Sequence, residues 1–369
     1  MKNVLIYGWF GENNVGDELL LKTILEMIAD NKRITPFVAC SNPNEVKKNH
    51  KVKIATVTID GSIKKFIKAL FMSPISLIKC MYETETLIVA GGGAISDWND
   101  ASTKEMFYLI NWFAKRKKSI YLLGIGAGPI MNEKPGGYFT TVLNKASEIT
   151  VRDIGSLTEL KKIGVKNVQL SNDLVSYSTL GQGESYQAKM KKIGIVVVPV
   201  CQSTPEVLET MREEWNKLIL LLDGAYEVSI IPFQMNYDMA FIQSLEFNHK
   251  TVKVCKPKKL WDTIDFVRQQ DCIIGMRYHS LILSILFGKK FIPIIYHNKT
   301  AELCKEYGIE KYACSIGNGE NWVDSNIDAQ DIFDKIKQLE HDGEFTKRNK
   351  MILDRKREKN IEREILRKI

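Results

Sequence analysis

The feature that most constrains this chain is a repeated pattern in which a short apolar run ends in glycine and a helical stripe follows. Val4–Tyr7 ends at Gly8, the run TLIVA leads into GGG, and SIYLLGI leads into GAGP. Continuous apolar runs of this length are typical of strands that are buried on both faces. Strands that alternate with helices form parallel sheets with right-handed crossovers, so the sequence predicts an α/β chain.

The pattern occurs twice, on either side of a polar stretch at residues 178–192. A length of 369 residues suits two domains, and the strands restart with KIGIVVVPV, YEVSIIPF, DCIIGMR and FIPIIY. We therefore predict two Rossmann-like domains facing each other across a cleft, at residues 1–180 and 190–345. A charged helix over 346–369 is expected to cross back to the first domain, by analogy with other two-domain folds of this kind.

The net charge of +8 favours an anionic partner, namely an anionic substrate, an anionic membrane surface or nucleic acid. Much of the excess lies in the C-terminal run from residue 347, which is typical of a solvated helix. Aromatic residues are not interleaved with basic ones, which argues against nucleic acid. No pattern in the sequence indicates an oligomeric state.

Cysteine and histidine usage predicts an intracellular protein without a metal site. The seven cysteines are odd in number and widely spaced, no C-x-x-C occurs, and the five histidines do not pair at metal-ligand spacing. We expect the cysteines to be reduced and buried. The N-terminal apolar run is too short for a signal peptide, and no run reaches the ~20 apolar residues of a membrane span, so we predict a cytoplasmic location.

Ligands of open α/β sheets bind beyond the carboxyl ends of the strands, where this chain places its glycine clusters. In the loop Gly8–Asp17, we expect Asp17 to cap a helix whose first amides suit an anion, although a simple tight turn explains the glycines equally well. Gly91–Gly93 precede Asp97, and GIGAGP supplies Gly126 and Gly128. Three such loops on one predicted edge favour a binding crevice.

In the second half, Arg277 and His279 stand between a buried strand and an apolar helix. Histidine suits acid–base chemistry near neutral pH, and the planar arginine fork suits carboxylate or phosphate. The alternative is that His279 only caps the helix. Arg152 ends the strand EITVRD. Lys299 follows FIPIIY at a helix start, where an anionic partner would offset its unfavourable position, unless it is an ordinary solvent-exposed lysine.

Six of these segments together resemble the polysaccharide pyruvyl transferase family. They are NNVGDELLL, GGGAISD, GIGAGP, VRDIGS, MRYHS and IIYHNK, which occur in the family's order between residue 4 and about residue 305. The resemblance implies a glycosyltransferase-B-like architecture and a metal-independent transferase with no cofactor. Phosphoenolpyruvate would be the donor, and the acceptor would be a sugar of a cell-surface polysaccharide, such as an exopolysaccharide or a cell-wall polymer, or its lipid-linked precursor.

Carried over by motif, the family's essential basic residues fall on Arg152, His279 and Lys299. We expect His279 to act as acid and base, and the other two to hold the donor's anionic groups. The remaining motif positions and strand-end glycines are predicted to bind substrate: Arg277, Asp17, Asp97, Gly16, Gly91, Gly92, Gly93, Gly126, Gly128 and Ser280.

Two other functions fit the same pattern. A glycosyltransferase that uses a nucleotide sugar would have the same architecture, and a non-catalytic member would only bind a glycan. Residues 62–83 mix lysines with apolar side chains. They predict either peripheral contact with the inner leaflet of the membrane, on its cytoplasmic face, or two helices packed on the first domain.

Overall fold

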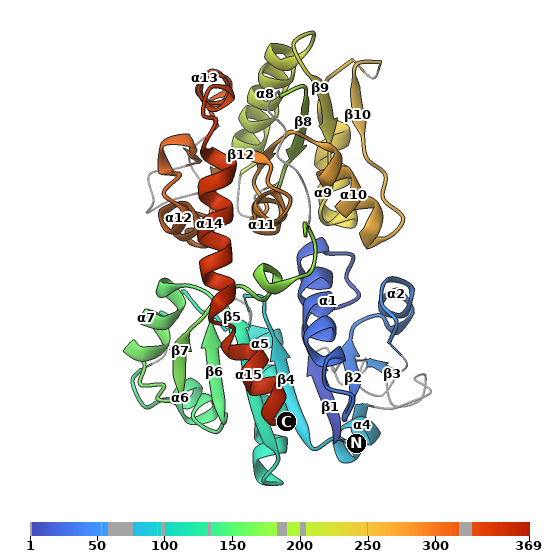
Figure 1. Ribbon diagram of the computed structural model, residues 1–369, viewed down its shortest axis with the longest axis vertical. Coiled ribbons are helices and arrows are strands. Elements are labelled where there is room, and N and C mark those ends of the chain that lie inside the picture. The colour runs from blue at the N-terminus through green and yellow to red at the C-terminus, as the bar shows by residue number, and fades with distance from the viewer. Residues whose placement is uncertain are drawn as a thin grey trace. The chain divides into compact units, whose positions relative to one another are not determined.

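The computed structural model divides the chain into two compact units, Met1–Thr179 with Lys356–Ile369, and Leu180–Arg355. We call them unit 1 and unit 2 (Figure 1). The residues that the structure describes are 2–52, 54–57, 77–93, 95–96, 100–131, 134–182, 190–199, 204–248, 250–316 and 327–369.

Unit 1 is built on a parallel sheet with the strand order β3-β2-β1-β4-β5-β6-β7 among its described residues. The chain starts at β1 in the interior of the sheet, moves outward to β3, and then returns to β4 on the other side of β1. The strand order therefore reverses between β1 and β4. The strands are β1 Lys2–Tyr7, β2 Ile34–Cys40, β3 Ile54–Val57, β4 Thr86–Ala90, β5 Ser119–Ile125, β6 Glu148–Val151 and β7 Val168–Leu170.

The helices of unit 1 bury apolar stripes against this sheet. Phe107, Ile110 and Phe113 lie on one face of α5 and pack with the apolar side chains of β4 and β5, at about 1.5–3 kcal/mol for each fully buried side chain. The helical segments are α1 Val15–Ala29, α2 Pro43–Asn49, α4 Leu77–Glu83, α5 Asp100–Lys115, α6 Tyr138–Leu143, α7 Ile154–Lys162 and the 3₁₀ turn η1 Leu174–Tyr177.

The predicted start of the first helix is wrong by three residues. Asn14, not Asp17, is the N-cap of α1, and its side-chain oxygen accepts a hydrogen bond from the Gly16 amide at 3.0 Å. Asp17 lies inside the first turn, where its negative charge favours the helix dipole. Both residue types suit a helix start, so composition alone does not separate the two positions.

Unit 2 repeats the design with the strand order β10-β9-β8-β11-β12-β13 among its described residues, and all its pairs are parallel. Its order reverses between β8 and β11. The strands are β8 Lys192–Val196, β9 Glu227–Ile230, β10 Val252–Val254, β11 Cys272–Gly275, β12 Lys290–Ile295 and β13 Cys314–Ser315. The helical segments are α8 Pro205–Leu222, α9 Met235–Ser244, α10 Leu260–Gln269, α11 Tyr278–Leu286, α12 Asn298–Tyr307, η2 Glu310–Tyr312 and α13 Ala329–Glu340.

The C-terminal residues belong to unit 1, although they follow unit 2 in the sequence. Unit 2 continues through most of α14 (Phe345–Glu358) rather than ending at residue 345. The last helix, α15 (Ile361–Lys368), contacts α1. The first crossing between the units, at Thr179, falls within the polar stretch 178–192.

The cysteines are buried as expected, apart from Cys201, which lies outside the described residues. Cys40, Cys80, Cys255, Cys272, Cys304 and Cys314 are buried free thiols. Burial raises the pKa of Cys40, Cys255, Cys304 and Cys314 to about 12, which disfavours their reactive thiolate form. Within the described part of the chain, no helix combines the length and the apolar character that crossing a bilayer requires.

Candidate functional site

The predicted loops of unit 1 follow β1, β4, β5 and β6, which are four neighbouring strands. Backbone hydrogen bonds join these loops to one another. The Gly126 amide donates to the Gly92 carbonyl at 2.7 Å, and the Arg152 amide donates to the Ile125 carbonyl at 3.1 Å. The sequence therefore located one continuous edge correctly, and this edge includes the point between β1 and β4 where the strand order reverses.

The glycine loop after β4 faces the start of α1. Gly92 has a φ of +76°, a conformation that glycine adopts without strain. A Cβ added at Gly92 would lie 3.8 Å from Asp17 Oδ1, so the Asp17 carboxylate borders the reversal point. Asp97, the other predicted carboxylate of this edge, lies outside the described residues.

Side chains of the protein itself hydrogen-bond to the backbone amides of the loop Gly8–Asp17. Glu18, which is 2% exposed, accepts a hydrogen bond from the Gly11 amide at 2.7 Å through Oε1. Its Oε2 lies 2.7 Å from His50 Nε2. The Gly11 and Gly16 amides thus have partners inside the protein, and an anion at this loop would need other donors. Sequence reasoning missed Glu18, although it directly follows the G-D pair of the motif.

Arg152 is 7% exposed and lies directly over the backbone of Gly126. A Cβ on Gly126 would approach Arg152 Nη2 to 2.6 Å, so only glycine leaves room for the guanidinium. Two carboxylates face Arg152: Asp153 Oδ2 lies 3.3 Å from Nε, and Asp173 Oδ2 lies 3.7 Å from Nη1. A bound anion would share Arg152 with both of them. Sequence reasoning did not single out Asp173.

The start of α7 fixes the loop after β5. Asp153 is the N-cap of α7 and accepts a hydrogen bond from the Ser156 amide at 2.7 Å. The Ser156 hydroxyl accepts one from the Ala127 amide at 2.9 Å, and Glu159 Oε2 accepts one from the Ile130 amide at 3.1 Å. The segments VRDIGS and GIGAGP therefore form a single hydrogen-bonded unit.

In unit 2, β11 ends at Gly275 and α11 begins immediately afterwards at the reversal point between β8 and β11. Arg277 is the N-cap residue of α11. His279 is the second residue of the helix and is half-buried, so the alternative that it caps the helix is wrong. Ser280 donates to the Arg277 carbonyl at 2.6 Å, and its hydroxyl fills the space beside Gly275. Residues 277, 279 and 280 thus lie within one turn.

Arg277 is held by Asp238, a carboxylate that the sequence reasoning missed. Asp238 is 0% exposed, and its Oδ1 lies 2.5 Å from Arg277 Nη2. Its Oδ2 accepts hydrogen bonds from the Phe233 and Gln234 amides at 2.9 and 2.8 Å. Within the described residues, the buried Nε of Arg277 has no hydrogen-bond partner. The sequence offers one signal for Asp238, namely that it is an acidic residue in the first turn of α9, the helix that follows β9.

Lys299 lies at the carboxyl end of β12, the strand next to β11. It is half-buried in the first turn of α12, and its amide donates to Nδ1 of the N-cap residue His297 at 3.3 Å. Unit 2 therefore places Arg277, His279, Ser280 and Lys299 on neighbouring strand ends. Arg152 belongs to unit 1.

Two further observations concern the chemistry of these edges. Tyr7, at the end of β1, is buried, and its burial together with the charge of Glu105 raises its pKa above the usual range, so it stays neutral. In the part of the chain that the structure describes, no three His, Cys, Asp or Glu side chains are grouped to hold a metal ion. Metal independence remains a prediction.

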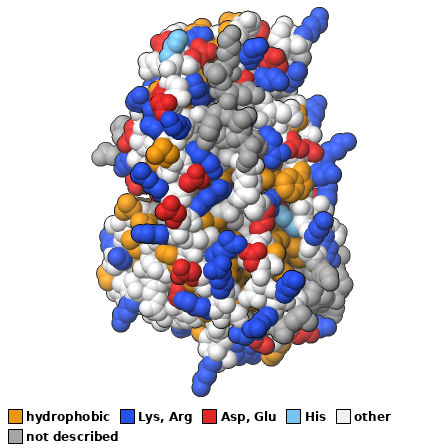
Figure 2. Space-filling view, in the orientation of Figure 1, with side chains coloured by type: hydrophobic (Ala, Val, Ile, Leu, Met, Phe, Trp, Pro, Cys, Tyr) orange, Lys and Arg blue, Asp and Glu red, His pale blue; other side chains and the backbone are white. Residues whose placement is uncertain are grey.

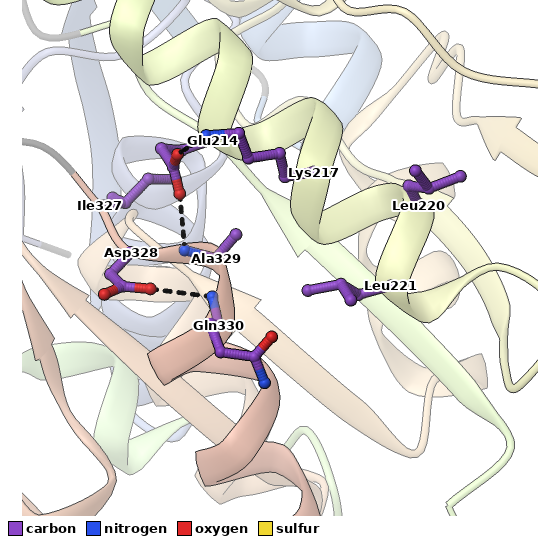
Figure 3. A pocket seen from close by; sticks show the side chains of 8 residues that line it. All are labelled: Glu214, Lys217, Leu220, Leu221, Ile327, Asp328, Ala329 and Gln330. Atoms are coloured by element: carbon purple, nitrogen blue, oxygen red, sulfur yellow. Dashed lines mark hydrogen bonds and ion pairs between the residues drawn. The ribbon is translucent and has the colours of Figure 1, made fainter.

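The described surface also has a hollow away from these strand ends, between α8 and the start of α13 (Figure 3). Its carboxylates are occupied: Glu214 accepts from the Ala329 amide at 2.9 Å, and Asp328 accepts from the Gln330 amide at 2.9 Å. None of the predicted site residues line it. Figure 2 shows Lys and Arg side chains spread over the visible face with Asp and Glu among them.

Comparison with known proteins identifies the family. The sequence matches the profile of the polysaccharide pyruvyl transferase family over residues 14–298. The chain belongs to this family. It is therefore a transferase, and the resemblance to this family that the sequence suggested is confirmed. No curated protein matches the sequence significantly.

Solved structures of similar fold include a UDP-GlcNAc 2-epimerase and a rhamnosyltransferase, and this chain shares their glycosyltransferase-B-like fold of two Rossmann-like domains. UDP-GlcNAc 2-epimerase from Neisseria meningitidis bound to UDP-GlcNAc has a TM-score of 0.62 at 13% identity, covering 100% of both chains. The S. aureus MnaA–UDP complex has a TM-score of 0.62 at 11% identity, covering 96% of this chain and 94% of the other. The rhamnosyltransferase SpnG with thymidine diphosphate has a TM-score of 0.56 at 9% identity, covering 100% and 99%. At such identities the likeness concerns the fold alone.

Proposed function

We propose that this family member transfers a pyruvyl group from phosphoenolpyruvate to two hydroxyls of a sugar in a cell-surface polysaccharide or its lipid-linked precursor. The observation that carries the proposal is the turn after β11. It presents His279 beside Arg277, whose buried Nε lacks a hydrogen-bond partner within the described residues. Lys299 on the next strand end adds a second cation.

The proposed reaction needs a proton donor, a proton acceptor and cations. Protonation of the methylene carbon of phosphoenolpyruvate turns it into a methyl group and leaves positive charge at C2, where a sugar hydroxyl adds and loses its proton. A second hydroxyl then displaces phosphate, gives up its proton to the base or to the departing phosphate, and closes the ketal. His279 is assigned the proton transfers because histidine is the residue type that most often serves as general acid and base in enzymes. Arg277, Lys299 and Arg152 are assigned to the carboxylate and phosphate.

The experiment is phosphate release from phosphoenolpyruvate by the purified protein, with a panel of lipid-linked and nitrophenyl sugars and a metal chelator present. We expect acceptor-dependent release that falls about 10²–10⁴-fold in His279→Ala, the range for a lost acid–base group. Ser244→Ala, an exchange on α9 away from the strand ends, is the matched control. Near-normal turnover of a folded His279→Ala protein would falsify the assignment of His279.

A nucleotide-sugar glycosyltransferase is the second candidate, because the structures of similar fold include complexes with UDP, UDP-GlcNAc and thymidine diphosphate. The donor separates the two functions. Thermal-shift titration with phosphoenolpyruvate and with UDP-sugars would show which one stabilises the protein. Stabilisation by UDP-sugars alone, without phosphate release from phosphoenolpyruvate, would favour the glycosyltransferase.

Membrane contact by residues 62–83 is also a proposal. The described end of this segment, α4, buries Leu77, Cys80 and Met81 within unit 1, while residues 62–76 lie outside the described residues. Liposome flotation with anionic lipids should recover the wild type and lose Lys64/Lys65/Lys68→Glu. Equal flotation of both proteins would contradict membrane contact through these lysines.

A further inference from the structure

The last residues of the chain form several hydrogen bonds with the loop of unit 1 that follows β7. We call Lys356–Ile369 the C-terminal strap and Ser171–Ser178 the β7 loop, which contains η1. The strap lies beyond the residues 14–298 that match the family profile. The β7 loop, in contrast, lies within the matched residues.

Arg357 makes the strongest of these contacts. Its Nε donates to the Ser176 carbonyl at 2.6 Å, and its Nη2 donates to the Ser178 carbonyl at 2.7 Å. One guanidinium thus satisfies two carbonyls at the end of η1, and charge-assisted hydrogen bonds of this kind are about twice as strong as neutral ones. These two hydrogen bonds from Arg357 fix the C-terminal end of the β7 loop.

Glu362 holds the other end of the loop. It is 0% exposed and accepts a hydrogen bond from the Ser171 hydroxyl at 2.8 Å. Between the two ends, the Asn172 side chain donates to the Lys356 carbonyl at 3.3 Å, and the Tyr177 hydroxyl donates to the Lys359 carbonyl at 3.2 Å. The strap therefore contacts the β7 loop at both of its ends.

The β7 loop in turn carries a carboxylate of the candidate site. Asp173 is the N-cap of η1, and its Oδ1 accepts from the Val175 amide at 3.0 Å. Its Oδ2 faces Arg152 Nη1 at 3.7 Å, and the Asp173 side chain is 1% exposed. Leu174 packs so tightly beneath β5 that a Cβ on Gly124 would lie 2.7 Å from its Cγ. A shift of the β7 loop would therefore move Asp173 relative to Arg152.

We propose that the C-terminal strap positions Arg152. Arg357 and Glu362 are positioning residues that fix the β7 loop, so that Asp173 holds the guanidinium over Gly126. This inference rests on the proposed function, because it explains how Arg152 is oriented toward the anionic donor. Without Asp173 in place, Asp153 would be the remaining acid of the two and would draw the guanidinium toward α7. Misplacement of a binding group by about 1 Å can reduce the rate about 10²-fold.

The test compares Arg357→Ala with Arg363→Ala. Both remove an arginine of the strap, but Arg363 pairs with Asp30 on the surface and does not contact the β7 loop. We expect Arg357→Ala to lower kcat/KM for phosphoenolpyruvate about tenfold to 100-fold with an unchanged KM for the acceptor, and Arg363→Ala to stay within about twofold. Equal losses in both variants would overturn the proposal.

A double-mutant cycle separates positioning from general destabilisation. If Arg357 acts through Arg152, adding Arg357→Ala to Arg152→Lys should cost little further activity, whereas unrelated effects would add. Glu362→Gln keeps a side-chain oxygen for Ser171 and should restore most of what Glu362→Ala loses. If Arg357→Ala fails to fold, the Glu362 pair carries the same test. Additive losses in the cycle would count against the strap acting on Arg152.

A readout without turnover distinguishes this inference from the proposed function. The Arg152 Nε–H signal in a nitrogen-15 NMR spectrum can be assigned by its disappearance in Arg152→Lys. We expect this signal to shift in Arg357→Ala and Glu362→Ala but not in Arg363→Ala, with no ligand present. If it shifts while the wild type neither binds nor consumes phosphoenolpyruvate, positioning stands and the proposed function fails. An unmoved signal in all three variants would reject positioning itself.

Discussion

Each unit places an arginine just after an interior strand and pairs it with a buried aspartate, but the two pairs differ in charge and closeness. Arg277 has one acidic partner at 2.5 Å, Asp238, and that carboxylate is locked by two backbone amides. Arg152 faces two acids, Asp153 at 3.3 Å and Asp173 at 3.7 Å. Among the ion pairs of the described residues, the first arrangement thus joins one cation to one acid, and the second joins one cation to two acids.

This difference indicates different tasks for the two arginines. Arg277 keeps a buried donor atom without a partner among the described residues, and such an atom gains from a bound anion or water. Arg152 is stacked on Gly126 and shared by two loops, so it also joins the loops after β5, β6 and β7. The same strand-end position is thus proposed to bind an anion in both units, and in unit 1 the arginine also joins three loops.

The largest expected effect is the loss of Asp238. Asp238→Ala would leave two backbone amides and the Arg277 guanidinium without their partner, which should cost about 3–5 kcal/mol. Asp173→Ala removes one amide contact and a longer ion pair, so about 1–3 kcal/mol is expected. Hydrogen exchange in urea would report each unit separately, because a chain of two units need not unfold in one step. Equal costs would remove the distinction between the pairs.

The next effect concerns the contact between Gly126 and Arg152. Gly126→Ala places a Cβ 2.6 Å from the guanidinium, so Arg152 must move, and we expect phosphate release to fall about tenfold to 100-fold. Gly343→Ala is the matched control, since its Cβ would meet nothing within 4 Å. A Gly126→Ala protein with normal activity and normal phosphate affinity would show that the position of Arg152 does not matter.

Glu362 in unit 1 and Asp342 in unit 2 should contribute to the pH dependence of stability with opposite signs. Burial raises the pKa of Glu362 despite hydrogen bonds from Ser171 and Thr150, so this stabilising contribution to unit 1 is lost as the pH rises from 4.5 through the raised pKa. Burial opposes ionisation of Asp342 too, but hydrogen bonds from Arg348 and Tyr312 lower its pKa to about 2. Its contribution to unit 2 is therefore lost as the pH falls from 3.8 toward about 2.

Two variants test these slopes. Glu362→Gln should make unit 1 less sensitive to rising pH, and Asp342→Asn should make unit 2 less sensitive to acid. Hydrogen-exchange protection of each unit between about pH 2 and pH 7 would measure both. A variant whose unit keeps the wild-type slope would contradict the assignment for that residue.

The smallest effect is expected for Asp153→Ser. Serine retains the N-cap of α7, and the lost ion pair with Arg152 is one of two, so stability should change by no more than about 1 kcal/mol. Removing one negative charge should strengthen phosphate binding at Arg152. Calorimetry with inorganic phosphate would detect this, and unchanged or weaker binding would show that Arg152 does not bind the anion.

The sequence was sufficient to predict the strands and their ends because both depend on short stretches of neighbouring residues. An apolar run closed by glycine identifies Val4–Tyr7 as a strand without any knowledge of its neighbours, and parallel pairing then brings the ends of β1, β4, β5 and β6 to one edge. The partners of the arginines could not be found in this way. Asp173 and Asp238 approach Arg152 and Arg277 from loops and helices far along the chain, and no periodicity encodes such pairings.

The first loop shows the same limit. Its glycines were recognisable, but their amides turned out to be occupied, because Glu18 reaches back to Gly11 and Asn14 caps α1. Whether a backbone amide is available depends on side chains that fold onto it, and these are set by tertiary packing. Asp97 and most of residues 62–83 lie outside the described residues, so their predicted roles remain predictions.

The discontinuous make-up of unit 1 has a consequence for the synthesis of the protein. The N-terminal part of a chain leaves the ribosome first, so the β7 loop emerges long before the strap that contacts it. At about 5–20 residues per second, the delay is on the order of 10–40 s. All of unit 2 is made within that interval and can fold first. Unit 1 acquires its final contacts only with the last segment of the chain, so a truncated product would lack the contacts of the strap with the β7 loop that carries Asp173.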